Sequence, residues 1–93
     1  MPLFVLTCID KPNALERRVG ARDAHLAYVR GSGIVKLAGP LLDERGEMAG
    51  SLLIVEAADL AAAQAFSADD PYAQADLFES VDVRPFKLTI GAL

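Results

Sequence analysis

The first segment of the chain, Leu3 to Ile9, is apolar at nearly every position and ends at the turn-forming run Asp10-Lys11-Pro12-Asn13. Phe4 and Val5 favour extended backbone, so this segment is predicted to be a strand that is buried on both faces. Such a strand cannot lie in a sheet with one face open to water unless something covers that face. This requirement constrains every fold that the chain could adopt.

The rest of the chain carries the signals of a helix, two strands joined by a polar loop, a second helix, a short helical turn and a last strand. The first helix is expected to be capped by Asn13 and ended by Gly31 and Gly33. Two strands, Ile34–Ala38 and Ser51–Glu56, should follow it. After them we expect a helix from Asp59 to Phe66, a turn opened by Asp70-Pro71, and a strand at Ser80–Leu88.

This order predicts an α+β fold, a ferredoxin-like βαββαβ plait with a four-stranded antiparallel sheet. Ninety-three residues make a single domain, residues 1–93. Both helices must then cover one face of the sheet, although Leu3–Ile9 and Leu52–Val55 are apolar on both faces. We therefore expect a homodimer, or a larger assembly of the same chain, packed sheet to sheet.

Composition excludes several classes of protein. Nine basic and thirteen acidic residues give a net charge of −4, which disfavours a nucleic-acid partner. A single cysteine, Cys8, cannot form an intramolecular disulfide or a zinc cage, and it is expected to be a small core residue. No apolar run approaches the ~20 residues that span a bilayer, and Met1-Pro2-Leu3-Phe4 is not the charged start of a signal peptide. We expect a cytoplasmic protein without a membrane partner.

The only histidine, His25, lies in the predicted first helix. The apolar stripe of that helix comprises Leu15, Val19, Leu26 and Val29, and helical spacing places Arg22 inside the stripe, with Arg18 and His25 at its margin. A guanidinium in an apolar stripe either reaches past it to a carboxylate or binds an anion or substrate. His25 is either a helix-edge imidazole bonded to a backbone carbonyl or a proton-transfer group.

Asp70 also has two interpretations. Before Pro71 it is expected to cap the short helix, but a carboxylate beside an imidazole fixes the tautomer and raises the basicity of the ring. Tyr72 is close enough to line the same pocket, whereas Tyr28 projects to the polar side of its helix as a surface or dimer contact. Ser51 lacks a nucleophile elbow and is expected at most to donate a hydrogen bond to a ligand.

Five motifs, taken in order, resemble the YCII-related family of small bacterial proteins. They are Arg22-Asp23-Ala24-His25-Leu26, Ala38-Gly39-Pro40, Gly50-Ser51, Asp69-Asp70-Pro71-Tyr72 and Val83-Arg84-Pro85-Phe86-Lys87. The resemblance implies a dimeric α+β barrel whose active site centres on His25 and Asp70, with Arg22, Ser51 and Tyr72 nearby. The family usually has Gly where Asp76 follows Ala75, so the rim of the pocket or the turn is expected to differ here.

Two functions remain open at this point. The first is an enzyme without cofactor or metal, an isomerase, lyase or dehydrochlorinase that moves a proton on a small anionic or phenolic substrate through His25 and Asp70. A closed cavity with both residues at its floor would favour this function. The second is a non-catalytic module that binds a small ligand, favoured by a shallow groove. Haem chemistry with His25 as an axial ligand is a third, weaker candidate.

Overall fold

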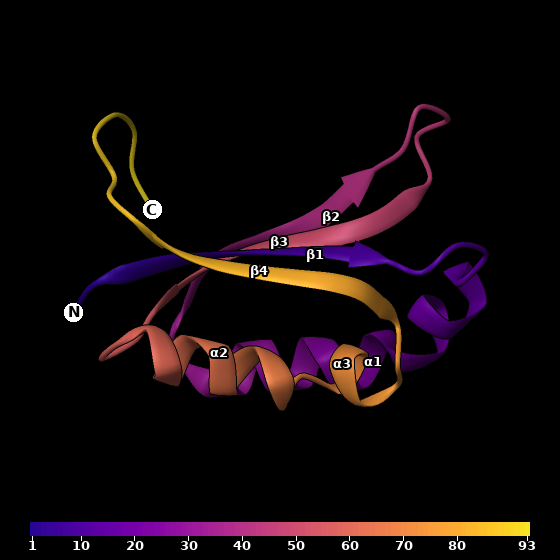
Figure 1. Cartoon of the computed structure of the whole chain (residues 1–93), viewed down its shortest axis with the longest axis horizontal. Helices are drawn as coiled ribbons and strands as arrows, with labels where there is room; N and C mark the ends of the chain where they lie inside the picture. The colour runs from indigo at the N-terminus through magenta and orange to yellow at the C-terminus, as the bar shows by residue number, and fades with distance from the viewer.

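Strand β1 (Leu3–Asp10) lies in the middle of a four-stranded antiparallel sheet with the order β2-β3-β1-β4 (Figure 1). The computed structural model describes residues 1–93. The other strands are β2 (Val35–Leu42), β3 (Met48–Glu56) and β4 (Phe78–Phe86). The helices are α1 (Leu15–Ser32), α2 (Leu60–Ala68) and α3 (Pro71–Gln74), and all lie on one face of the sheet. The predicted α+β plait is therefore confirmed.

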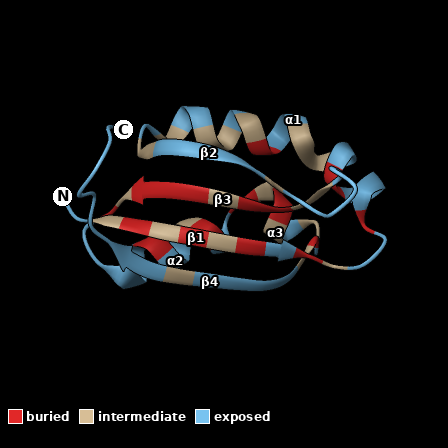
Figure 2. Cartoon of the chain, turned by 90° about the horizontal axis from the view of Figure 1, so that it is seen from above, coloured by how far each residue is buried: buried red, intermediate tan, exposed pale blue.

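Side chains of β1 alternate between the two faces of the sheet. Phe4, Leu6 and Cys8 point toward the helices and form the core with Leu53 and Val55 of β3. The residues between them point to the face without helices, which we call the open face. Figure 2 shows the buried residues concentrated on β1 and β3, with exposed residues along β2 and β4. One face of the apolar central strands is thus covered within a single chain. The other is covered only in part, because Ile54 is buried whereas Ile9 is exposed.

The predicted cap of α1 is wrong. Asn13 adopts a left-handed conformation with φ of 58°, and the N-cap residue is Ala14, whose side chain makes no capping hydrogen bond. Asparagine tolerates this conformation better than most residues, so Asn13 completes the turn that leaves β1 instead of capping the helix. At the other end, Gly33 has φ of 72° and ends the helix as predicted.

Only the C-terminal half of the apolar stripe predicted for α1 faces the sheet, where Val29 packs against the core. Leu15 and Val19 are 41% and 50% exposed, whereas the buried residues of this helix are Arg18 and His25. The sheet explains the difference, because below this part of α1 it presents Asp10 and other polar groups in place of an apolar surface. The helix therefore turns its polar residues inward, where they find partners.

Tyr28 is not the surface or dimer contact that was expected. Its ring stacks on Phe66 of α2, with centroids 4.8 Å apart, and its hydroxyl donates a hydrogen bond of 2.7 Å to the carbonyl oxygen of Phe66. This pair fastens α2 to α1. None of the helices combines the length and apolarity that crossing a membrane requires.

We predict that Gly50→Ala destabilises the fold by about 1–3 kcal/mol, because the added Cβ would overlap the backbone carbonyl oxygen of Cys8 where β3 pairs with β1. Urea unfolding measures the change. The control is Gly20→Ala in α1, where no atom lies within 4 Å of the added Cβ and stability should rise by about 0.5–1 kcal/mol. Equal effects at the two glycines would contradict the close approach at Gly50.

Candidate active site

His25 and Asp70 form a buried pair beneath α1. The Nδ1 atom of His25 lies 2.8 Å from Oδ1 and 3.0 Å from Oδ2 of Asp70. The same Oδ1 accepts a hydrogen bond of 2.8 Å from the backbone amide of Tyr72, so Asp70 also caps α3. The two interpretations of Asp70 are therefore compatible, because one carboxylate makes both contacts. With Nδ1 donating to Asp70, Nε2 is the imidazole atom that can exchange a proton with a ligand.

Arg18 and Asp10 are site residues that the sequence analysis missed. The Arg18 guanidinium, 2% exposed as a residue, donates from Nε and Nη2 to the two carboxylate oxygens of Asp10 at 2.7 and 2.9 Å. Nη2 also donates to Oγ of Ser51 at 2.8 Å. Burial opposes the charged form of Arg18, but its hydrogen bonds with Asp10 and the carboxylate charge outweigh burial and raise the arginine pKa. The side chain is fixed as a cation.

One signal in the sequence could have revealed this pair. Asp10 ends the first strand in phase with Phe4, Leu6 and Cys8, which places a carboxylate on the buried face. A buried carboxylate needs a cation. Arg18 lies seven residues before His25, which places the two side chains on the same side of α1.

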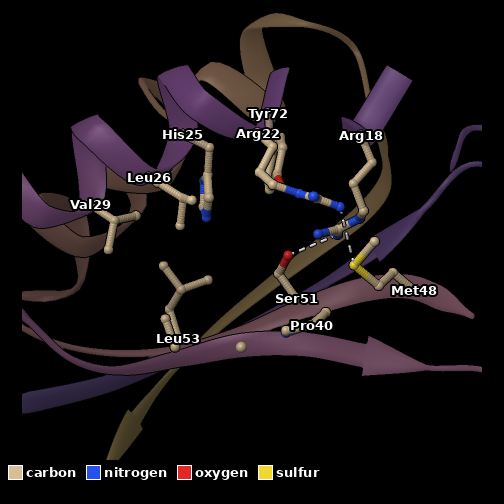
Figure 3. Close-up of a pocket in the computed structure, with 12 residues that line it drawn as sticks. Arg18, Arg22, His25, Leu26, Val29, Pro40, Met48, Ser51, Leu53 and Tyr72 are labelled. Carbon is tan, nitrogen blue, oxygen red and sulfur yellow. Dashed lines mark hydrogen bonds between the residues drawn. The ribbon is translucent and has the colours of Figure 1, made fainter. Parts of the chain in front are cut away.

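Tyr72 lies between the imidazole of His25 and the guanidinium of Arg18 (Figure 3). Its ring stacks on the imidazole of His25 with centroids 3.9 Å apart and an angle of 13° between the planes. Cζ of Arg18 lies 4.7 Å from the Tyr72 centroid, within the range of a cation–π contact. Phe78 meets the Tyr72 ring edge-on at 6.1 Å. Tyr72 therefore fixes the plane of the imidazole.

A cavity of about 200 Å³ lies between α1 and the β2–β3 side of the sheet (Figure 3). It is lined by Arg18, Arg22, His25, Leu26, Val29, Ala38, Gly39, Pro40, Met48, Ser51, Leu53 and Tyr72. Four of the five predicted site residues, His25, Arg22, Ser51 and Tyr72, thus lie around one cavity. Asp70 does not line it and reaches it only through His25, contrary to the expectation of a carboxylate at the floor.

Arg22 has no carboxylate partner. Its side chain makes one long hydrogen bond, 3.9 Å from Nη2 to the sulfur of Met48. The interpretation of Arg22 as a side chain that reaches out to a carboxylate is therefore wrong; Arg18 is the arginine paired in that way. Arg22 instead leaves an unneutralised cation in the wall of the cavity.

Asp76 does not reshape the cavity. It keeps the left-handed turn that glycine would adopt, with φ of 58°, and its 80% exposed side chain points to solvent. The Nζ atom of Lys11 lies 2.6 Å from its carboxylate, and this hydrogen bond, together with the lysine charge, lowers the pKa of Asp76. Arg17 donates to its carbonyl oxygen at 2.7 Å. The substitution changes an exposed turn and leaves the rim of the site as it is.

The sequence profile of the YCII-related domain matches residues 2–87. The chain belongs to this family. It is 39% identical over 94 residues to Protein YciI of Escherichia coli O6:H1, across 91% of this chain and 96% of the relative. Among solved structures it is similar to the 5-chloro-2-hydroxyhydroquinone dehydrochlorinase of Burkholderia phenoliruptrix AC1100 in complex with 2,5-dihydroxybenzoquinone, with 32% identity, a TM-score of 0.83 and coverage of 91% of this chain and 93% of that one.

More distant solved structures share only the fold with this chain. An antibiotic biosynthesis monooxygenase is 14% identical with a TM-score of 0.60, over 97% of this chain and 100% of the other. No three metal-ligating side chains of the YCII-related chain converge on a point that could hold an ion.

Cys8, buried beneath the site, is predicted to be unreactive in the folded protein. Burial, together with the charge of Asp70, raises the pKa of its thiol from 9.0 to about 12. A thiol reagent at pH 8 should therefore modify Cys8 only after denaturation. Because the pKa is higher in the folded state, Cys8 contributes stability that is present below pH 9 and is lost as the pH rises toward 12. Rapid labelling of the native protein at pH 8 would contradict this assignment.

Proposed function

We propose that this protein binds a small anionic or phenolic ligand and moves a proton on it without a cofactor, with His25 as the general base or acid. The observation that carries the proposal is the composition of the cavity wall. An imidazole and two guanidinium groups face the cavity, whereas Asp10 and Asp70, the carboxylates paired with Arg18 and His25, do not line it. A ligand with a negative charge or an ionisable hydroxyl complements such a wall.

The two arginines have different tasks in this proposal. Asp10 already neutralises Arg18, so this side chain supplies hydrogen-bond geometry and contributes little net charge to the ligand. Arg22 carries the uncompensated charge and would bind the anionic group of the ligand, exchanging its weak contact with Met48 for a charge-assisted hydrogen bond. Ser51 accepts from Arg18, which leaves its own O–H free to donate to the ligand.

The chemistry would take place at Nε2 of His25. Asp70 holds the opposite ring nitrogen and would stabilise the imidazolium that forms when His25 takes a proton from the ligand. A dehydrochlorinase removes a proton and chloride from its substrate, and the similarity to such an enzyme supports an elimination or isomerisation of a hydroxylated ring. The 2,5-dihydroxybenzoquinone bound to that relative supplies a first probe ligand.

Our second candidate is a non-catalytic binding module. It is favoured by one observation, the contact of Asp70 with the amide of Tyr72, which gives the carboxylate a structural task independent of His25. In that case the pocket would bind its ligand reversibly and the ligand would leave unchanged.

We predict that His25→Gln lowers the rate of chloride release from 5-chloro-2-hydroxyhydroquinone by about 10²–10⁴-fold, because the amide cannot accept the proton. Gln can still donate to Asp70, so affinity for 2,5-dihydroxybenzoquinone should stay within about twofold of wild type by calorimetry. Full turnover in the variant would overturn the role of His25. Binding without turnover in the wild type would favour the second candidate.

Arg22→Gln should show the opposite pattern, with at least about tenfold weaker binding of the quinone, because the charge that neutralises the ligand is lost. The matched control is Arg30→Gln, an exposed arginine in the last turn of the same helix that does not line the cavity. Equal affinities for both variants would contradict the assignment of Arg22.

We further propose that a second copy of the chain covers the open face. Thr7 and Leu52 lie near its centre, and Ile9 and Leu37 on it are 40% and 45% exposed in the single chain. An apolar surface of this kind is stabilised when another copy removes it from water.

Leu52→Glu is predicted to convert the dimer to a monomer in sedimentation experiments, because a carboxylate would be buried in the apolar interface at a cost of several kcal/mol. Val19→Glu is the matched control, since Val19 is an exposed apolar residue on α1, away from the open face. The proposed dimer fails if the wild type sediments as a monomer or if Leu52→Glu stays dimeric.

A further inference from the structure

A second cavity, of about 220 Å³, lies beside the candidate site. It is formed where β1 leads into α1 and where the loop between β2 and β3 ends. Its lining residues are Asp10, Lys11, Pro12, Asn13, Ala14, Leu15, Asp43, Arg45, Glu47, Met48 and Ala49. Met48 is the one residue that also lines the first cavity, so its side chain forms part of the wall between the two. The Arg18–Asp10 pair forms another part, because Arg18 lines the first cavity and Asp10 the second.

The Met48 side chain in this wall has few contacts that hold it in place. Met48 is the first residue of β3, and it pairs with Leu42 next to an irregularity in the register of β2. Its sulfur makes only the 3.9 Å contact with Arg22, and a thioether is a weak acceptor on an unbranched, flexible side chain. Arg18, by comparison, is fixed by three hydrogen bonds. Met48 and Arg22 can therefore separate at little cost, whereas a movement of Arg18 would break three hydrogen bonds.

The volume of the first cavity limits the part of a ligand that it can enclose. A cavity of roughly 150 Å³ holds one benzene molecule, so about 200 Å³ accommodates a single ring with small substituents. The second cavity is polar, with Asp10, Asp43, Glu47, Lys11 and Arg45 among its lining residues. Lys11 is already paired with Asp76. Any part of a ligand that extended past Met48 would therefore need to be polar.

We infer that Met48 determines the length of the substrate. In its observed position it restricts the site to single-ring ligands, and its displacement opens the second cavity to a polar extension of the same ligand. The inference rests on the proposed function, because it concerns the ligand that Arg22 and His25 would bind.

The test compares Met48→Ala with Met48→Leu, which conserves the volume of the wall. The probes are 2,5-dihydroxybenzoquinone and the same quinone with a 2-carbamoylethyl group at C3, a neutral polar extension, and calorimetry gives both dissociation constants. We expect wild type and Met48→Leu to bind the extended quinone at least about tenfold more weakly than the parent. In Met48→Ala this difference should shrink at least about fivefold.

An unchanged ratio of the two dissociation constants in Met48→Ala, or equal binding of both quinones by the wild type, would overturn the role of Met48 while leaving the proposed function intact. Failure of the wild type to bind the parent quinone would overturn the proposed ligand class. A crystal structure of Met48→Ala decides the role of Met48 without any ligand. One continuous cavity supports it, and a repacked wall that keeps two cavities apart overturns it.

Discussion

The buried ion pair between Arg18 and Asp10 is the interaction on which the rest of the site depends. A guanidinium removed from water is tolerated only when its donors are satisfied, and here the partners come from the end of β1 and the middle of β3. These contacts fix how α1 lies over the sheet. The position of α1 in turn decides where His25 and Arg22 point, so the polar pair determines the geometry that an apolar stripe would otherwise set.

The site has two layers with separate tasks. The inner layer, Asp10 and Asp70, carries the negative charges and makes hydrogen bonds that also hold β1 and the start of α3 in place. The outer layer faces the cavity with the cations, the imidazole and the apolar side chains. Because the carboxylates are withdrawn, the wall is electrostatically suited to an anion, although the protein as a whole carries a net charge of −4. The charges that line the cavity, and not the net charge of the protein, therefore determine the sign of the potential at the site.

Much of this structure could be predicted from the sequence. The plait follows from the order of strand and helix patterns, and the pairing of His25 with Asp70 is implied by the family motifs. The part that was not predicted is the buried pair of Arg18 and Asp10. Reasoning from apolar periodicity assumes that the buried side of a helix is its apolar side, and in α1 that assumption fails because Leu15 and Val19 are exposed while Arg18 is buried. The polar residues that face inward are those that find partners on strands distant in sequence. The spacing of residues along one helix does not identify those partners.

The stack of Tyr72 on His25 has a consequence for spectroscopy. The chain contains no tryptophan and only two tyrosines, Tyr28 and Tyr72. Tyr28 is stacked between two helices, and Tyr72 is in contact with the imidazole and with the Arg18 guanidinium. The tyrosine fluorescence of the protein therefore reports either on the packing of α1 against α2, through Tyr28, or on the site itself, through Tyr72. The unmodified protein carries an optical probe at the point where a ligand would bind.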